Sequence, residues 1–129
     1  MIRMTKGLYI QDTPDKGRGV FCLYPILKGT TIEESPVLVM SAADRIHLDQ
    51  TPLKDYIFEW GEDHLSCCTA WGYLSMYNHS YNSNAEYFMD FETRTMSIVA
   101  VRDIAIGEEI TTNYNGDWND EKKLWFDAI

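Results

Sequence analysis

Short runs of hydrophobic and β-branched residues, separated by turn-forming sequences, predict β-strands in the N-terminal third of the chain. The segments 7–12 ("GLYIQD") and 19–24 ("GVFCLY") flank the turn sequence "TPDKGR". Two further strands are expected at 26–34 ("ILKGTTIEE") and 37–41 ("VLVMS"), with Pro36 between them. Closely spaced strands and turns of this kind indicate a mainly β domain.

The second half of the chain predicts a β-hairpin and contains an echo of the first half. Residues 86–91 and 96–102 are rich in β-forming residues and are separated by the polar turn "ETRT". The segments 26–34 and 104–112 both place isoleucine, glycine and isoleucine at their first, fourth and seventh positions. Two copies do not make a solenoid, but they predict two similar strand–turn–strand units that face each other or play parallel roles.

Helices are expected only in the middle and at the C-terminal end. Residues 51–60 predict a helix, since Thr51 can act as its N-cap and Pro52 suits the first helical position. The tail 119–129 opens with acidic residues, which a helix N-terminus prefers. No linker or low-complexity run divides the chain, so residues 1–129 are expected to form a single, mainly β domain with little helix.

The net charge of −9 bears on the kind of partner. It argues against binding nucleic acid through its phosphates. It would attract basic partners, including lysine- and arginine-rich peptides, although an acidic surface can also serve solubility alone.

Cysteine usage and hydropathy predict an intracellular protein without a structural metal. The three cysteines, Cys22, Cys67 and Cys68, include an adjacent pair that suits neither a disulfide framework nor a zinc site. No apolar run is long enough to cross a membrane, and the N-terminus lacks the features of a signal peptide. Cytoplasm, nucleus and delivery into a host cell are not distinguished.

The first motif with chemical potential is "KGRGVF", residues 16–21. Gly17 and Gly19 permit positive φ angles and close approach of a ligand to the backbone. A dinucleotide-binding fingerprint is excluded, because no third glycine follows and a strand replaces the required helix. A phosphate-binding P-loop is excluded as well, and a plain hairpin turn stays the alternative.

Two further motifs concentrate polar residues between apolar segments. In "NHSYNSNAEY", residues 78–87, the Asn-His pair could bond a heterocycle, and His79 could act as a general base or metal ligand. No second histidine stands nearby at ligand spacing, so a solvated or structural role for His79 is the alternative. In "GEEITTNYN", residues 107–115, a turn and a strand lead to Tyr114, which could simply cap the core.

Taken together and in this order, the three motifs resemble those of the SET-domain protein lysine methyltransferases. "GRGVF" is similar to the family's N-terminal cofactor motif. "NHSYNSN" is similar to its Asn-His-Ser-x-x-Pro-Asn pattern, with Ser83 where proline is usual, and "GEEITTNY" to its Gly-Glu-Glu-Leu/Ile-Thr-x-x-Tyr motif. The resemblance covers roughly residues 7–118 and is greatest to the small, free-standing members known from bacteria and viruses.

The resemblance implies a fold and a cofactor. The SET fold is a set of small twisted sheets around a C-terminal pseudoknot, an exception to the rule against threaded connections. It brings the Asn-His-Ser and tyrosine segments together, with Asn78 and His79 lining a pocket for S-adenosylmethionine (SAM) and Asn84 stitching the loop by hydrogen bonds. The methionine end of SAM would be held, chiefly by main-chain groups, by Lys16, Gly17, Arg18 and Gly19.

The resemblance also implies the reaction and places Tyr114 at the catalytic position. A neutral substrate lysine would attack the methyl carbon of the sulfonium directly, leaving S-adenosylhomocysteine. Positioning and dehydration would supply most of the catalysis. A lysine side chain in water has a pKa of about 10.4, which a neighbouring sulfonium would lower. No metal and no protein general base are required.

Aromatic residues wall the lysine channel in the family, and Tyr56 and Tyr87 are the candidates here. The position two before the catalytic tyrosine often sets the number of methyl groups, and Thr112 stands there. Tyr87 would fill that space from another strand and restrict the product to mono- or dimethyllysine. Packing on the core is the alternative for Tyr87.

The tail 115–129 would replace the family's zinc-binding post-SET segment. Its aromatic residues Trp118, Trp125 and Phe126 could cover the cofactor or the lysine stem, with Trp118 the expected cofactor contact. Alternatively, Trp125 and Phe126 anchor the last helix.

The expected partner is a basic, flexible protein segment such as a histone tail, drawn in by the acidic charge. No contact with nucleic acid or membrane is expected. A chain of this size has little surface for reading a long substrate, so it would form a homodimer or rely on a short motif plus charge. The alternative function is a catalytically silent SET-fold module that binds SAM or a protein partner.

Overall fold

The computed structural model describes residues 3–62 and 64–113, and this part of the chain is mainly β, as expected. Its helical segments are α1 (Ala42–Leu48) and the 3-10 helices η1 (Pro52–Asp55) and η2 (Leu74–Met76). Its strands are β1 (Arg3–Met4), β2 (Leu8–Thr13), β3 (Gly17–Cys22), β4 (Thr31–Met40), β5 (Phe58–Trp60), β6 (Ser66–Ala70), β7 (Asn78–His79), β8 (Ala85–Asp90), β9 (Thr95–Ala100) and β10 (Glu109–Thr112).

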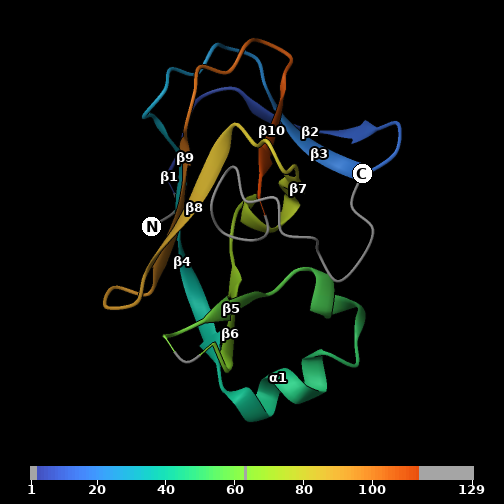
Figure 1. Cartoon of the computed structure of the whole chain (residues 1–129), viewed down its shortest axis with the longest axis vertical. Coiled ribbons are helices and arrows are strands. Elements are labelled where there is room, and N and C mark those ends of the chain that lie inside the picture. The colour runs from blue at the N-terminus through green and yellow to red at the C-terminus, as the bar shows by residue number, and fades with distance from the viewer. Residues whose placement is uncertain (1–2, 63, 114–129) are drawn as a thin grey trace.

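Hydrogen bonds connect the strands in an order far from that of the sequence. Among the described residues the path runs β2-β3-β10-β8-β9-β4-β6-β5, while β1 also pairs with β4 and β7 with β10. Figure 1 shows the β2–β3 ribbon beside the upper end of β10, the β4, β8 and β9 strands running down one side, and α1 below. The late strand β10 therefore lies among segments from the start and the middle of the chain.

The strand expected to stop at Pro36 runs through it. β4 is one strand from Thr31 to Met40, so the expectation of separate segments at 26–34 and 37–41 is wrong. Thr31 to Pro36 pair with β9, whereas Val37 to Met40 pair with β6. Pro36 lies where β4 changes its pairing partner from β9 to β6. Its missing N–H therefore falls at the end of one set of strand hydrogen bonds and not in the middle of either set.

The helix expected over residues 51–60 is also wrong beyond its first turn. Thr51 caps η1 by accepting from the Leu53 N–H at 3.2 Å, and Pro52 opens it as expected. The segment then becomes β5, because Phe58 and Trp60 face inward while Glu59 between them faces solvent. The helix present, α1, follows the Ser41-x-x-Asp44 capping box, a sequence signal that could have located it.

The expected hairpin is found, and of the two arrangements expected for the echoed segments, the one in which they face each other is found. β8 and β9 pair antiparallel around a turn at residues 91–94. Ile26 and Ile104, the first residues of the two echoes, form an antiparallel bridge with backbone N···O distances of 2.8 and 2.9 Å in the two directions. The isoleucines three residues beyond each glycine, Ile32 and Ile110, are fully buried. The two units thus face each other and share one core.

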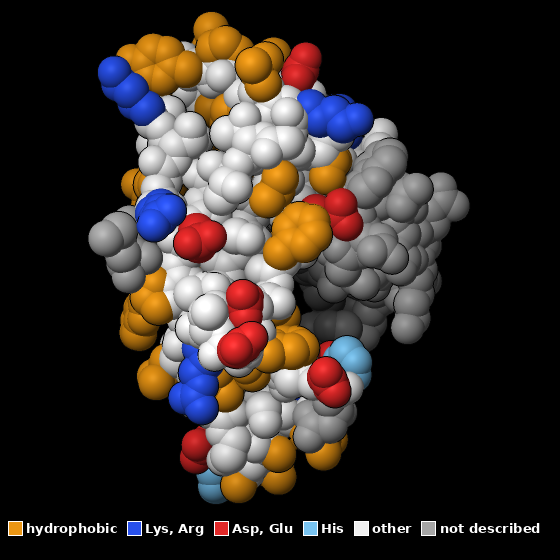
Figure 2. Space-filling view, turned by 90° about the vertical axis from the view of Figure 1, so that its left-hand side faces the viewer, with side chains coloured by type: hydrophobic (Ala, Val, Ile, Leu, Met, Phe, Trp, Pro, Cys, Tyr) orange, Lys and Arg blue, Asp and Glu red, His pale blue; other side chains and the backbone are white. Residues whose placement is uncertain are grey.

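The two turns of these units form one end of the molecule (Figure 1), and hydrophobic side chains cover that end (Figure 2). The exposed large apolar residues of the two turns are Leu23, Tyr24, Leu27 and Ile106. The described residues include no helix that is long and apolar enough to cross a membrane.

Candidate functional site

The parallel pairing of β7 with β10 creates the candidate site. Asn78 lies opposite Thr111 and His79 opposite Thr112, and the Ser80 N–H continues the ladder by donating to the Thr112 carbonyl at 2.9 Å. On its other edge β10 pairs antiparallel with β3, with Ile110 opposite Val20. The three motifs found in the sequence therefore meet side by side.

Asn78 holds these three segments together. Its side-chain amide nitrogen donates to the Glu109 carboxylate at 2.7 Å and to the Arg18 carbonyl at 3.0 Å. Gly19 has to be glycine for this approach, because a Cβ there would collide with the Glu109 carboxylate and would stand 3.0 Å from the Asn78 nitrogen. Sequence reasoning missed Glu109, although it is the second glutamate of "GEEITT".

Lys16 and His79 lie next to each other at the edge of this junction. The Lys16 ammonium donates to the His79 carbonyl at 3.2 Å. The His79 ring is buried and meets Tyr81 edge to face, with 4.4 Å between ring centroids. Burial lowers the pKa of His79, and the positive charge of Lys16 lowers it further. At neutral pH His79 therefore presents a neutral ring and an occupied main-chain carbonyl.

Asn84 stitches the polar loop to β10 as expected. Its amide nitrogen donates to the Glu109 carbonyl at 2.8 Å and the Glu108 carboxylate at 3.0 Å, and its oxygen accepts from the Thr111 N–H at 2.8 Å. Asn84 is almost fully buried. Satisfying its polar atoms in this way makes its burial tolerable.

Ser83, which stands where the resembled pattern has proline, is held by two other contacts. Its hydroxyl donates to the Ala85 carbonyl at 3.0 Å, and its carbonyl accepts from Arg102 at 2.8 Å. Hydrogen bonds thus replace the conformational restriction that proline would supply at this turn.

The three expected channel residues occupy different environments. The Tyr87 hydroxyl donates to the Leu74 carbonyl at 2.7 Å, and its ring meets Phe58 edge to face at 5.2 Å between centroids. Tyr56 is exposed, and its carbonyl accepts from the Ser75 hydroxyl at 2.9 Å. The aromatic residue packed on Tyr87 is therefore Phe58, which the sequence reasoning placed inside a helix.

Thr112 sits at the centre of the crossing strands. It is fully buried and lies opposite His79 on β7 and Ala85 on β8. Its hydroxyl makes no hydrogen bond within the part of the chain that the structure describes. A buried hydroxyl of this kind is available to a ligand or a water. Asn113, the last described residue, is also buried.

The remaining candidates, Tyr114 and Trp118, lie outside the described residues, as do Trp125 and Phe126. Between residues 3 and 113, with residue 63 excepted, no cluster of three or more His, Cys, Asp or Glu side chains could hold a metal ion. Cys22, Cys67 and Cys68 are buried free thiols, and burial raises the pKa of Cys68 to about 12.

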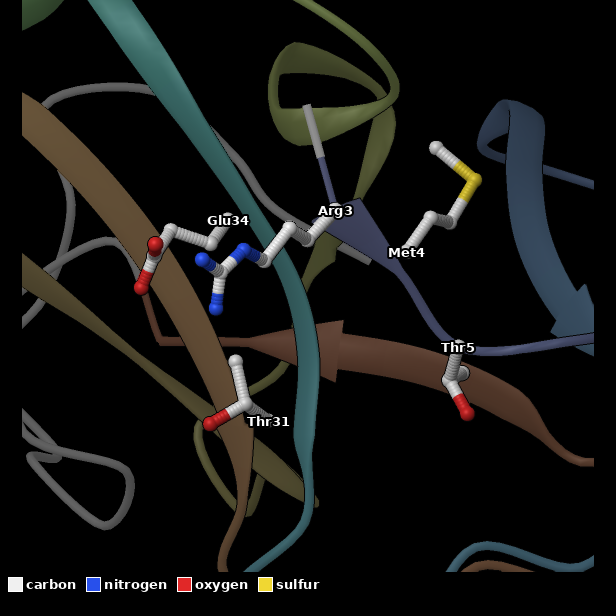
Figure 3. A pocket seen from close by; sticks show the side chains of 5 residues that line it. All are labelled: Arg3, Met4, Thr5, Thr31 and Glu34. Atoms are coloured by element: carbon white, nitrogen blue, oxygen red, sulfur yellow. The ribbon is translucent and has the colours of Figure 1, made fainter. Parts of the chain in front are cut away.

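A shallow hollow at the β1–β4 edge contains none of the motif residues. Its five lining residues, shown in Figure 3, are Arg3, Met4, Thr5, Thr31 and Glu34. Arg3 and Glu34 are cross-strand neighbours in register. The described motif residues therefore lie at the β3–β10–β7 junction and not in this hollow.

Comparison with known proteins points to one family. The SET-domain family model matches residues 17–115. The chain is 37% identical over 121 residues to a histone-lysine N-methyltransferase of Schizosaccharomyces pombe, described as specific for lysine 37 of histone H3, and the match covers 93% of this chain and 77% of that protein. A crystal structure of a candidate histone methyltransferase of Plasmodium falciparum superposes with a TM-score of 0.65 at 27% identity, covering 89% of this chain and 98% of the other.

Proposed function

The chain belongs to the SET-domain family, and from that premise we propose that it is a SAM-dependent protein lysine N-methyltransferase. The observation that carries this proposal is the junction at Asn78, where one side chain bonds both the Arg18 carbonyl and the Glu109 carboxylate. This contact joins all three segments that the cofactor and substrate would need. A relative that is a histone-lysine N-methyltransferase supports a histone or histone-like substrate.

The described residues around the junction fit SAM. The Lys16 ammonium, located next to the β3 backbone, has the charge to bind the methionine carboxylate. Gly17 has open space where its side chain would be, so a ligand can approach the main chain there. The buried His79 ring and Tyr81 supply aromatic surface. We assign cofactor binding to Lys16, Gly17, Arg18, Gly19, Asn78 and His79, with Trp118 added on the resemblance alone.

When bound, the cofactor supplies an electrophilic methyl group on a sulfonium. The protein's task is to present a neutral lysine amine in line with that methyl and to exclude water. Tyr114 would orient the amine lone pair through its hydroxyl, and the preceding strand β10, fixed on both edges, would hold it in place. Main-chain carbonyls near the reacting methyl would add weak C–H···O contacts. The ammonium proton can leave to water.

The lysine channel would be walled by Tyr87 and Thr112, with Tyr56 at its exposed mouth. The Tyr87 hydroxyl donates to the Leu74 carbonyl, and this bond holds both the hydroxyl and the ring of Tyr87 in one position. Thr112 contributes a buried hydroxyl without a partner among the described residues. We propose that this wall limits the product to mono- or dimethyllysine.

The substrate segment would be basic, because a chain of net charge −9 attracts lysine- and arginine-rich peptides. The test is methyl transfer from isotopically labelled SAM to a mixture of histones and basic cell proteins, with Tyr114→Phe alongside. Labelling that is lost in the variant is expected. If the wild-type protein labels nothing but is stabilised by SAM in a thermal shift, the chain is a binding module and the proposal fails.

A further inference from the structure

Glu33 on β4 is a fully buried carboxylate that the mechanism above does not use. Its two oxygens have separate partners. Oε1 accepts from the Tyr77 hydroxyl at 2.7 Å, and Oε2 accepts from the Tyr73 N–H at 2.7 Å. Both donors belong to the segment that contains η2, one residue before it and one residue after it.

The backbone around Glu33 is shaped to accommodate this contact. Strands normally alternate inward and outward residues, yet Ile32 and Glu33 are both fully buried. The register of β4 against β9 shifts between Thr31 and Glu33, so that two steps on β4 match one on β9. This β-bulge turns Glu33 toward η2, and bulges are enriched next to active sites for such re-aiming.

Gly72 completes the arrangement from the other side. It has a φ of +71°, and a Cβ at that position would collide with Glu33 Oε2. The glycine therefore lets the chain turn immediately before Tyr73 and leaves room for the carboxylate.

The segment held by Glu33 supports both halves of the proposed site. Inside it, the Leu74 carbonyl receives the Tyr87 hydroxyl at 2.7 Å and the Ser75 hydroxyl reaches the Tyr56 carbonyl at 2.9 Å. At its end, Tyr77 directly precedes Asn78, the residue that joins the three cofactor segments. The channel wall and the cofactor strand thus share one short support.

We propose that Glu33 is a positioning residue for methyl transfer, which clamps both ends of η2 and so sets the Tyr87 wall and the Asn78–His79 strand at the same time. The effect of Glu33 on methyl transfer rests on the proposed function. Its effect on the position of η2 rests on the geometry alone. In this role Glu33 acts through its bonds to Tyr73 and Tyr77.

Glu33 holds this segment through its two hydrogen bonds and not through the negative charge of its carboxylate. Glutamine at position 33 would keep the bond from the Tyr73 N–H to its oxygen and would replace the other bond with one of opposite direction, in which its amide donates to the Tyr77 oxygen. Alanine would remove both and leave the partly buried Tyr73 N–H without its acceptor. Glu33→Gln should therefore retain the position of the η2 segment and the activity that Glu33→Ala loses.

The experiment compares Glu33→Ala, Glu33→Gln and a matched core control, Ile26→Ala. Ile26 is nearly as buried, but its backbone bridges to Ile104. The first readout is native-state hydrogen exchange of the Met76 and Ser80 amides, which bond to Tyr73 and Thr112. Relative to β9 amides of the same variant, exchange at both should rise about tenfold in Glu33→Ala and less than about threefold in the other two.

The second readout is kinetic, measured well below the unfolding temperature of each variant. Glu33→Ala should lower kcat/KM about tenfold or more, whereas Glu33→Gln and Ile26→Ala stay within about threefold of wild type. Equal local exchange in Glu33→Ala and Ile26→Ala would overturn the proposal, as would a Glu33→Gln variant as impaired as Glu33→Ala. If the wild-type chain transfers no methyl group while the exchange pattern holds, the proposed function fails and the clamp stands.

Discussion

The side chains of Asn78 and Glu109 bond to each other across the parallel strands β7 and β10, with 2.7 Å between the amide nitrogen and the carboxylate oxygen. The same nitrogen also reaches the Arg18 carbonyl on β3. One asparagine therefore ties together three strands that are distant in sequence. An isosteric change that removes its donors should reveal how far the site depends on it.

Asn78→Asp is the corresponding variant. It keeps the shape of the side chain but sets a carboxylate against Glu109 and against the Arg18 carbonyl. The loss of both donors and the new repulsion should lower the free energy of unfolding by about 1–3 kcal/mol and weaken SAM binding. Urea denaturation and calorimetric titration with SAM measure the two effects.

The double variant Asn78→Asp/Glu109→Gln is the control for this interpretation. The amide introduced by Glu109→Gln can donate to the carboxylate introduced by Asn78→Asp, which removes the repulsion and restores one of the two bonds. Part of the lost stability should return. A double variant that is less stable than Asn78→Asp would show that the contact between the two side chains contributes nothing.

Substitutions of Gly19 and Gly17 distinguish a steric effect of an added side chain from an effect of backbone conformation. A Cβ on Gly19 would push the Glu109 carboxylate away from Asn78, whereas a Cβ on Gly17 meets nothing within 4 Å but adopts a φ of +74°. Gly17→Ala should cost about 1–2 kcal/mol of stability through backbone strain and leave the contact between Asn78 and Glu109 intact. Gly19→Ala should weaken SAM binding more than Gly17→Ala does, although the carboxylate it displaces is the mobile end of a side chain. Equal SAM affinities in the two variants would contradict this.

The sequence was informative about the site wherever a residue acts through a local pattern. Asn78, His79 and Asn84 stood out because polar side chains are dense there, and the two Ile-x-x-Gly-x-x-Ile echoes predicted two similar units, which the structure joins by the bridge between Ile26 and Ile104. That the Asn-His-Ser segment and the segment leading to Tyr114 come together was implied only by the family resemblance, and their parallel pairing was not predicted. Composition and periodicity do not specify which distant segments meet.

The sequence could not predict the burial of residues whose orientation depends on strand register. Glu33 and Glu34 are adjacent and chemically alike, and alternation would send one of them to solvent. The bulge at Thr31–Glu33 decides which one is buried, and a bulge has no sequence signature here. Phe58 was missed for a related reason, because "TPLKDYIFEW" opens with helix-start signals and changes to a strand soon after the first turn.

Tyr87→Phe tests the limit on methylation. The change removes the hydroxyl that donates to the Leu74 carbonyl at 2.7 Å, which frees space and removes a polar group from the channel wall. Products should shift toward di- and trimethyllysine, with a stability loss of about 1 kcal/mol. Mass spectrometry of the methylated peptide gives the distribution, with Tyr24→Phe, at the exposed far end, as the control. A Tyr87→Phe variant with no higher methylation states would remove Tyr87 from this role.

The pH dependence of stability tests the burial of Glu33. Burial raises the pKa of this carboxyl above its ordinary value of 4.5, and the bonds from Tyr77 and Tyr73 offset the rise only in part. A raised acid pKa means that the folded state holds the proton more tightly than the unfolded state. The stability linked to that proton is therefore complete below about pH 4.5 and is lost as the pH rises through the folded-state pKa.

Glu33→Gln, which resembles the protonated acid at every pH, should accordingly be more stable than wild type at pH 8. The difference should shrink as the pH falls through the folded-state pKa, and measurements stop at pH 5.5 because the isoelectric point of about 4.6 limits solubility. Urea unfolding across this range gives the slope. Glu34→Gln is the matched control, since it makes the same chemical change one residue away at a partly exposed position. A Glu33→Gln advantage that does not vary with pH would mean that Glu33 is ionised in both the folded and the unfolded state across this range, and that burial does not raise its pKa into it.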